Sequence, residues 1–298
     1  MAGRRQTMRI AACLGVRDEV ELVGPAIEHL RRIGVDLIIA CDAGSTDGTY
    51  EYMERLRSKD DFWLFRCSDE EPDNGETWAR AQVALVKSAN VDWTIFLDAD
   101  EFWLPRNGRL ADCEELHHND ILLVRRFNIP ISMEGPYAPD PMVPANYGKV
   151  LLLNQDVERK KEFMLENPNQ AWVLMSAVPK AMARPSFIGT IRAGAHDVIV
   201  ADSRLVRKST SSDILIAHLP FTTKPRFQRK LRNIRRLLGV HREAAGSYQG
   251  WHWRRWLQLE DEGKLDDEFE KSVFTQADID HLLGAGILFS ADDLLNAK

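Results

Sequence analysis

An acidic cluster directly follows one of the most apolar stretches of the sequence. Residues 93–97 lead into Asp98-Ala-Asp100-Glu101. Two carboxylates two residues apart at a strand end can both face one divalent ion once the chain turns. Mg²⁺ and Mn²⁺ prefer such oxygen ligands together with the phosphates of a substrate. The pattern therefore indicates a metal site that binds a diphosphate. Acids after a strand also commonly cap the next turn, so the spacing alone leaves both interpretations open.

A second motif, rich in small residues, follows another apolar run at residues 37–41. It reads Asp42-Ala-Gly-Ser-Thr-Asp-Gly-Thr49. Its glycines permit a tight strand-to-helix turn and a close approach of the backbone to a ligand. By itself the motif is also compatible with an ordinary turn.

The elements that must position these motifs alternate along the chain from residue 8 onward. Apolar runs are followed by amphipathic stretches, which is typical of parallel β-α-β units. Strands are predicted at 10–16, 37–41, 62–65, 93–97, 121–127 and 150–153, with Gly34 closing the first helix. Ligands of such sheets bind outside the carboxyl ends of the strands, so one cleft is expected to gather the polar residues that follow them.

The composition excludes several classes of protein. The chain has 298 residues, of which 44% are hydrophobic and 28% charged, and its net charge is −6, which argues against disordered and fibrous proteins. No apolar run approaches the ~20 residues of a membrane-spanning helix, so no integral membrane span is expected. The four cysteines are widely separated, which argues against a zinc site or a disulfide scaffold and favours a reducing, cytoplasmic location.

The order and spacing of the motifs resemble family-2-type glycosyltransferases of the GT-A fold. The resemblance is strongest over residues 8–105 and rests on Arg17-Asp18-Glu19, residues 37–49, Ala79-Arg80 and residues 96–102. It implies an α/β fold with a GT-A-like, Rossmann-type, mostly parallel sheet flanked by helices and a C-terminal helical extension. The expected domains are a catalytic domain at 1–222, with a nucleotide-sugar-binding half (8–105) and an acceptor-side half (106–222), and a helical region at 223–298.

The resemblance also implies roles for single residues of the donor half. Asp42 would read the nucleotide base, Arg80 would lie near the base or the diphosphate, and Asp98 would face the ribose side. Asp100, with Asp98, would hold Mn²⁺ or Mg²⁺ against the diphosphate of a nucleotide-sugar donor, with a UDP-sugar favoured. Further donor-site residues are expected at Arg17, Glu19, Lys180 and Lys230.

The second half of the chain carries no motif that identifies a general base for the acceptor. The candidates are Glu134, Asp140 and Asp197. The segments around His196 and His218 resemble the histidine-bearing segments of a subgroup of these enzymes. A neutral imidazole of His218 is expected to complete the metal site, and the alternative is that both histidines are structural.

A basic stretch at residues 224–242 carries eight Lys or Arg and no acid, interleaved with an apolar stripe. Such a helix can lie against phosphates, anionic lipid or nucleic acid, or it can pack by its apolar side with the basic side in solvent.

These observations predict a metal-dependent glycosyltransferase that moves a sugar from a nucleotide-diphosphate donor to an acceptor hydroxyl, with inversion. A glycan, lipid, protein or modified nucleic acid remains open as the acceptor, and so does the oligomeric state. One alternative is a haloacid-dehalogenase-like phosphatase. Such enzymes usually carry Asp-x-Asp on the first strand and follow it with Gly-Thr. Here the motif follows the fourth predicted strand, and Glu101-Phe102 come after it. The other alternative is a non-catalytic nucleotide- or nucleic-acid-binding relative, which metal and nucleotide binding would test.

Overall fold

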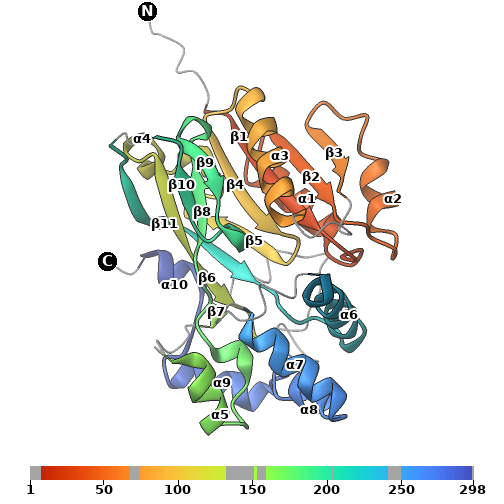
Figure 1. Cartoon of the computed structure of the whole chain (residues 1–298). Helices are drawn as coiled ribbons and strands as arrows, with labels where there is room; N and C mark the ends of the chain where they lie inside the picture. The colour runs from red at the N-terminus through yellow and green to blue at the C-terminus, as the bar shows by residue number, and fades with distance from the viewer. Residues whose placement is uncertain are drawn as a thin grey trace, which may run out of the picture. The chain divides into compact units, whose positions relative to one another are not determined.

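The computed structural model describes residues 8–67, 74–131, 151–152, 159–202, 205–240 and 250–296. The chain divides into two compact units (Figure 1). The first comprises Met1–Asp69, Asp73–Arg126 and Val178–Ile216, and the second comprises mainly Phe127–Ala177 and Ala217–Lys298. This division differs from the predicted boundary at residue 222, because residues 127–177 group with the C-terminal segment.

An eight-stranded sheet with the order β3-β2-β1-β4-β8-β6-β11-β5 is the main element of the fold. Its first four strands are β1 (Ile10–Val16), β2 (Leu37–Asp42), β3 (Phe62–Arg66) and β4 (Trp93–Asp98). They pair in parallel. β1, β2 and β4 are almost wholly buried, as expected of parallel strands covered on both faces, and this explains their nearly continuous apolar sequences.

The remaining strands of this sheet are β5 (Glu101–Pro105), β6 (Ile121–Asn128), β8 (Lys180–Ala183) and β11 (Lys208–His218). β8 runs antiparallel to both β4 and β6, so the sheet is parallel in its N-terminal half and mixed beyond it. Two small sheets pair β9 (Ile188–Ile191) with β10 (Val198–Val200) and β7 (Leu151–Leu152) with β12 (Leu288–Phe289). The predicted α/β class is confirmed, whereas β5, β8 and β11 had no clear signal in the sequence.

The helices of the first unit are α1 (Val23–Arg32), α2 (Thr49–Glu54), α3 (Asn74–Ser88) and α4 (Glu115–His118). α3 packs Val83 and Val86 in a cluster with Ala11, Leu37 and Ile39 of the sheet. Gly34 follows α1 with φ of 85°, and its N–H donates to the Arg31 carbonyl, so the predicted helix end is confirmed. Short 3₁₀ helices lie at Leu110–Asp112, Trp172–Leu174, Pro185–Phe187 and Ala193–Ala195.

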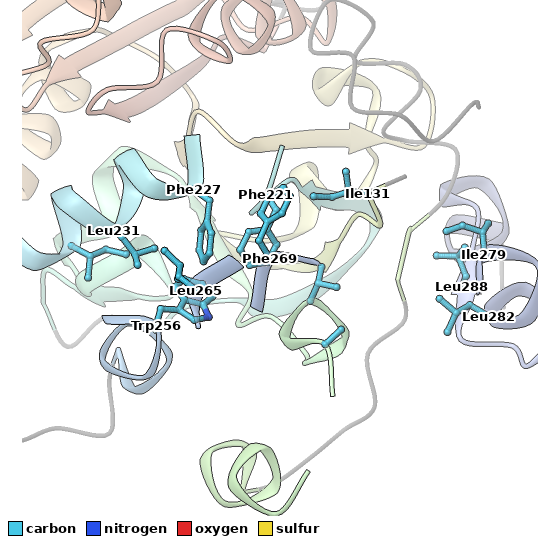
Figure 2. Packing of buried hydrophobic residues seen from close by; sticks show 13 residues of the cluster. Ile131, Phe221, Phe227, Leu231, Trp256, Leu265, Phe269, Ile279, Leu282 and Leu288 are labelled. Carbon is cyan, nitrogen blue, oxygen red and sulfur yellow. The ribbon is translucent and has the colours of Figure 1, made fainter. Parts of the chain in front are cut away.

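The second unit is mainly helical, with an aromatic core (Figure 2). Its helices are α5 (Lys160–Glu166), α6 (Lys224–Val240), α7 (Trp251–Asp261), α8 (Leu265–Glu270), α9 (Gln276–Gly284) and α10 (Ala291–Asn296). Phe227 of α6 packs edge-on against Phe221 and Trp256, with ring centroids 4.9 and 5.3 Å apart. In the described part of the chain, no helix is both long and apolar enough to cross a bilayer.

Truncating the central ring of this core should destabilise the protein. Phe227 is 2% exposed, so we expect Phe227→Ala to lower the free energy of unfolding by about 3–5 kcal/mol through lost packing and the cavity left behind. Urea denaturation followed by fluorescence measures the change. The control is Gln228→Ala on the exposed side of α6, which should stay within about 0.5 kcal/mol of the parent. Equal stabilities of the two variants would contradict the packing described here.

Candidate functional site

Two acidic segments of the first unit lie at the carboxyl ends of parallel strands. Asp42 ends β2 and Asp98 ends β4, and β1 pairs with both strands, so the two ends lie on the same edge of the sheet. This is the edge at which ligands of such sheets bind. The structure thus brings together the two motifs that the sequence separates by about fifty residues.

The Asp42 carboxylate is buried by the turn that follows it. It accepts hydrogen bonds from the backbone N–H of Gly44 (3.1 Å) and Ser45 (3.2 Å), and its side chain has no exposed surface. Arg66, its register partner at the end of β3, pairs with it at 3.1 Å from Nε. The Arg66 guanidinium also lies over the ring of Tyr50, 4.5 Å from its centroid. Arg66 therefore covers the carboxylate, a contact that the sequence patterns did not indicate.

The loop after β1 is bonded to the same turn. The Arg17 guanidinium donates to the Ala43 carbonyl, and the backbone N–H of Glu19 donates to Thr49 Oγ1 at 2.9 Å. Asp18, between them, accepts from the backbone N–H of Thr46 at 2.7 Å. The segment 17–19 and the turn at 42–49 thus form one hydrogen-bonded rim, as the common strand edge predicted.

A buried charge network holds the acids at the end of β4. Lys180 Nζ lies 2.8 Å from Asp98 Oδ2 and 3.2 Å from Glu101 Oε2. Arg126 donates to the other oxygen of Glu101 at 2.6 Å, and Glu101 Oε2 also accepts from the backbone N–H of Asp98 at 3.1 Å. The Lys180 side chain is 2% exposed and that of Glu101 is fully buried. Neither Glu101 nor Arg126 was predicted as a site residue, although Glu101 belongs to the acidic motif.

The pKa values of this network follow from burial and from the opposite charges. Burial raises the pKa of Glu101, and the charge of Lys180 opposes that rise. Burial alone would lower the pKa of Lys180, but Asp98 and Glu101 outweigh it and the pKa is raised. Lys180 therefore stays protonated, and its ammonium is held by carboxylates of the chain itself.

The predicted metal ligands Asp98 and Asp100 differ in exposure. The Asp98 side chain is 55% exposed although one oxygen contacts Lys180, whereas Asp100 is 3% exposed. Among the described residues, no group of three or more His, Cys, Asp or Glu is arranged to hold a metal ion. The two aspartates supply the oxygen ligands that Mg²⁺ and Mn²⁺ prefer, so the donor type fits, while the described residues of the first unit assemble no third ligand.

The third predicted metal ligand, His218, belongs to the second unit. Its Nδ1 lies 2.7 Å from Asn128 Oδ1, and Asn128 Nδ2 donates to the carbonyls of Val173 (2.8 Å) and Met175 (3.2 Å). These donations fix the Asn128 amide with its oxygen toward the imidazole, so Nδ1 of His218 carries the proton. Nε2 is then the acceptor nitrogen of the neutral ring, as in the oriented histidines of metal sites.

The remaining predicted site residues differ in burial and in their hydrogen-bond partners. Arg80 is exposed on α3, and Lys230 is half-buried on α6 of the second unit. Burial lowers the pKa of His196 to about 4, and its Nδ1 lies 2.9 Å from the Pro179 carbonyl. Burial alone would raise the pKa of Asp197, but its bond to Lys208 (2.7 Å) and other contacts lower it, which makes this carboxylate a poor proton acceptor at neutral pH. Glu134 and Asp140 lie outside the described residues.

Removing the buried ammonium should destabilise the protein in a pH-dependent way. We expect Lys180→Met to lower the free energy of unfolding by about 3–5 kcal/mol at neutral pH, because buried carboxylate charge loses its partner. Without Lys180, the pKa of Glu101 rises further, so the folded variant takes up a proton as the pH falls. The deficit should therefore shrink from about pH 8 to about pH 5.

Urea denaturation across this pH range measures the deficit. Lys87→Met, at an exposed position of α3, is the matched control and should leave stability unchanged at every pH. A deficit of Lys180→Met that does not vary with pH would show that Glu101 does not titrate in response to Lys180.

A family model described as Glycosyl transferase family 2 matches residues 14–134. No curated protein matches the sequence. Among solved structures, TarS 1–349 of S. aureus is similar with 13% identity, covering 78% of this chain and 65% of that one, at a TM-score of 0.41. The same protein in complex with UDP-GlcNAc has 14% identity, covers 68% and 59%, and has a TM-score of 0.37.

Glucosyl-3-phosphoglycerate synthase from Mycobacterium tuberculosis, in complex with Mn²⁺, UDP and glucosyl-3-phosphoglycerate, has 14% identity, covers 78% of both chains and has a TM-score of 0.35. This chain spans about two thirds or less of the length of the TarS structures. The segment 14–134, which carries Asp42, Asp98 and Asp100, is thus the part of the chain that is similar to glycosyl transferase family 2.

Proposed function

We propose that this chain is a metal-dependent glycosyltransferase that moves a sugar from a nucleotide-diphosphate donor, preferably a UDP-sugar, to an acceptor hydroxyl with inversion. The observation that carries the proposal is the position of Asp42 and of the 98–101 acids at one strand edge within the family 2 segment. The acceptor is a hydroxyl of a glycan, lipid, protein or modified nucleic acid.

In this proposal Asp42 reads the nucleotide base. A carboxylate accepts a hydrogen bond from the imide N–H of uracil, whereas the corresponding N3 of cytosine carries no hydrogen to donate. Arg66 covers the carboxylate at 3.1 Å and is itself 51% exposed, so its side chain has room to move aside as the base arrives. Arg17, Glu19 and Arg80 are proposed to line the donor on the same side.

The metal is proposed to be Mn²⁺ or Mg²⁺, held by Asp98 and Asp100, and a role of His218 as a further ligand stays a prediction from the sequence. When bound, the metal would supply positive charge to the departing diphosphate. Lys180 contributes by orienting Asp98, because its ammonium is engaged by Asp98 and Glu101. Lys230 remains a proposed diphosphate contact.

The general base is proposed to be Glu134 or Asp140 in preference to Asp197. An effective base at neutral pH needs a pKa that is not depressed, and Asp197 is bonded to Lys208. Replacing Glu134 or Asp140 by the amide should then lower turnover of a sugar donor more than its affinity.

The metal assignment predicts a specific defect in Asp100→Ala. We expect Mn²⁺ to increase the UDP affinity of the parent. In the variant this Mn²⁺-dependent increase should be at least about tenfold smaller, because a carboxylate ligand has been removed. Calorimetric titration with UDP, with and without Mn²⁺, measures the affinities. Asp60→Ala, at an exposed position of the same unit, should behave as the parent. An unchanged Mn²⁺ effect in folded Asp100→Ala would exclude Asp100 as a ligand, and a parent that binds no nucleoside diphosphate would overturn the proposed function.

The base assignment predicts altered discrimination in Asp42→Asn. The amide keeps the size of the side chain but replaces an acceptor by a donor at one position, so preference for UDP over GDP and CDP should fall by about tenfold. Competition titrations with the three nucleotides measure the preference, and Asp112→Asn, an exposed acid of the same unit, is the control. Identical preferences of Asp42→Asn and the parent would assign Asp42 a purely structural role.

A further inference from the structure

Two cysteines meet at the ends of the neighbouring strands β2 and β3. Cys41 is the penultimate residue of β2, and Cys67 directly follows β3. Their Sγ atoms lie 2.6 Å apart, and neither is in a disulfide. The backbone N–H of Cys67 donates to the Asp42 carbonyl at 2.9 Å, so the sheet ladder itself holds the two residues together.

The sulfurs and the Asp42–Arg66 ion pair lie on opposite faces of this strand pair. Asp42 and Arg66 are register partners, and successive side chains of a strand point to opposite faces. Cys41 and Cys67 each adjoin one member of the ion pair in sequence. A covalent bond between the sulfurs would therefore restrain both residues of the pair.

The Cys67 thiol differs from those of Cys13 and Cys113 in the direction of its pKa shift. Burial raises the pKa of Cys13 and of Cys113 to about 12, so both stay protonated. The hydrogen bond with Cys41 lowers the pKa of Cys67, against the effect of burial, and Cys67 is only partly buried. Because the thiolate is the nucleophile in thiol–disulfide exchange, Cys67 is the residue that would react first.

We propose that Cys41 and Cys67 form a site of reversible disulfide formation, with a small-molecule disulfide such as glutathione disulfide as the oxidant. The Cys67 thiolate attacks one sulfur of the oxidant, forms a mixed disulfide and releases one thiolate. The Cys41 sulfur then attacks the Cys67 sulfur and expels the second thiolate, which takes up the Cys41 proton. Two protein thiols are oxidised, one disulfide forms in the chain, and one small-molecule disulfide is reduced to two thiols.

The disulfide has a consequence for the ion pair next to it. The Asp42 side chain is fully buried by the following turn and paired with Arg66, so in the proposed function Arg66 moves aside as a base arrives. A disulfide at Cys67 restrains the backbone of the adjacent residue and opposes this movement. The oxidised protein is therefore expected to bind UDP more weakly than the reduced protein, an expectation that rests on the proposed function.

The test equilibrates the full chain in buffers of reduced and oxidised glutathione, quenches with acid, and counts alkylatable thiols by mass after unfolding. Oxidising buffer should remove two of the four thiols, peptide mapping should link Cys41 to Cys67, and excess reduced glutathione should restore all four. Cys67→Ser should keep its three thiols, whereas Cys113→Ser, the control, should still form the link. Four alkylatable thiols in oxidising buffer, or a link through Cys13 or Cys113, would overturn the proposal without relying on any variant.

UDP titration of the two mapped forms tests the consequence separately. Weaker binding by the oxidised form supports it, and equal affinities overturn it. If the reduced protein binds no UDP while the Cys41–Cys67 link is mapped, the proposed function fails and the disulfide site stands.

Discussion

A buried ammonium between two carboxylates is the interaction on which the acidic edge of the sheet depends. Lys180 is the first residue of β8, which pairs with β4 and β6, so strand order carries its side chain to the acids that follow β4. Glu101 is fully buried, and an unpaired carboxylate at this position would be costly. Lys180 and Arg126 together compensate Glu101, while Asp98 remains half exposed. The network thus separates a structural acid from one that can face a ligand.

A second cross-strand contact organises the opposite side of β1. Asp42 and Arg66 pair at the ends of β2 and β3, and the hydrogen-bonded turn from Gly44 to Thr49 closes over the carboxylate. This half of the edge is held by backbone N–H groups and one half-exposed guanidinium, and the other half by a buried lysine. The difference matters for a binding site, because the half-exposed Arg66 can be displaced at less cost than the almost fully buried Lys180.

The second unit contains an aromatic core and the basic helix α6. Its aromatic core explains why the tryptophans of α7 are clustered, since Trp256 packs against Phe221 and Phe227. At least two of the seven basic residues of α6 form ion pairs within this unit, because Lys224 pairs with Glu270 and Arg235 with Glu260. A run of basic residues in the sequence therefore does not translate directly into a free basic surface.

The sequence by itself determined the elements whose signal is local. The strands predicted at 10–16, 37–41, 62–65 and 93–97 agree with β1 to β4 to within one residue, because buried parallel strands are continuous apolar runs bounded by turn residues. The acids at the ends of β2 and β4 followed from the same pattern. Only the tertiary structure decided that Lys180 reaches Asp98 across 82 residues, that Arg66 covers Asp42, and that residues 127–177 join the C-terminal unit. These contacts depend on strand order and on antiparallel pairing between distant segments, which local periodicity does not encode.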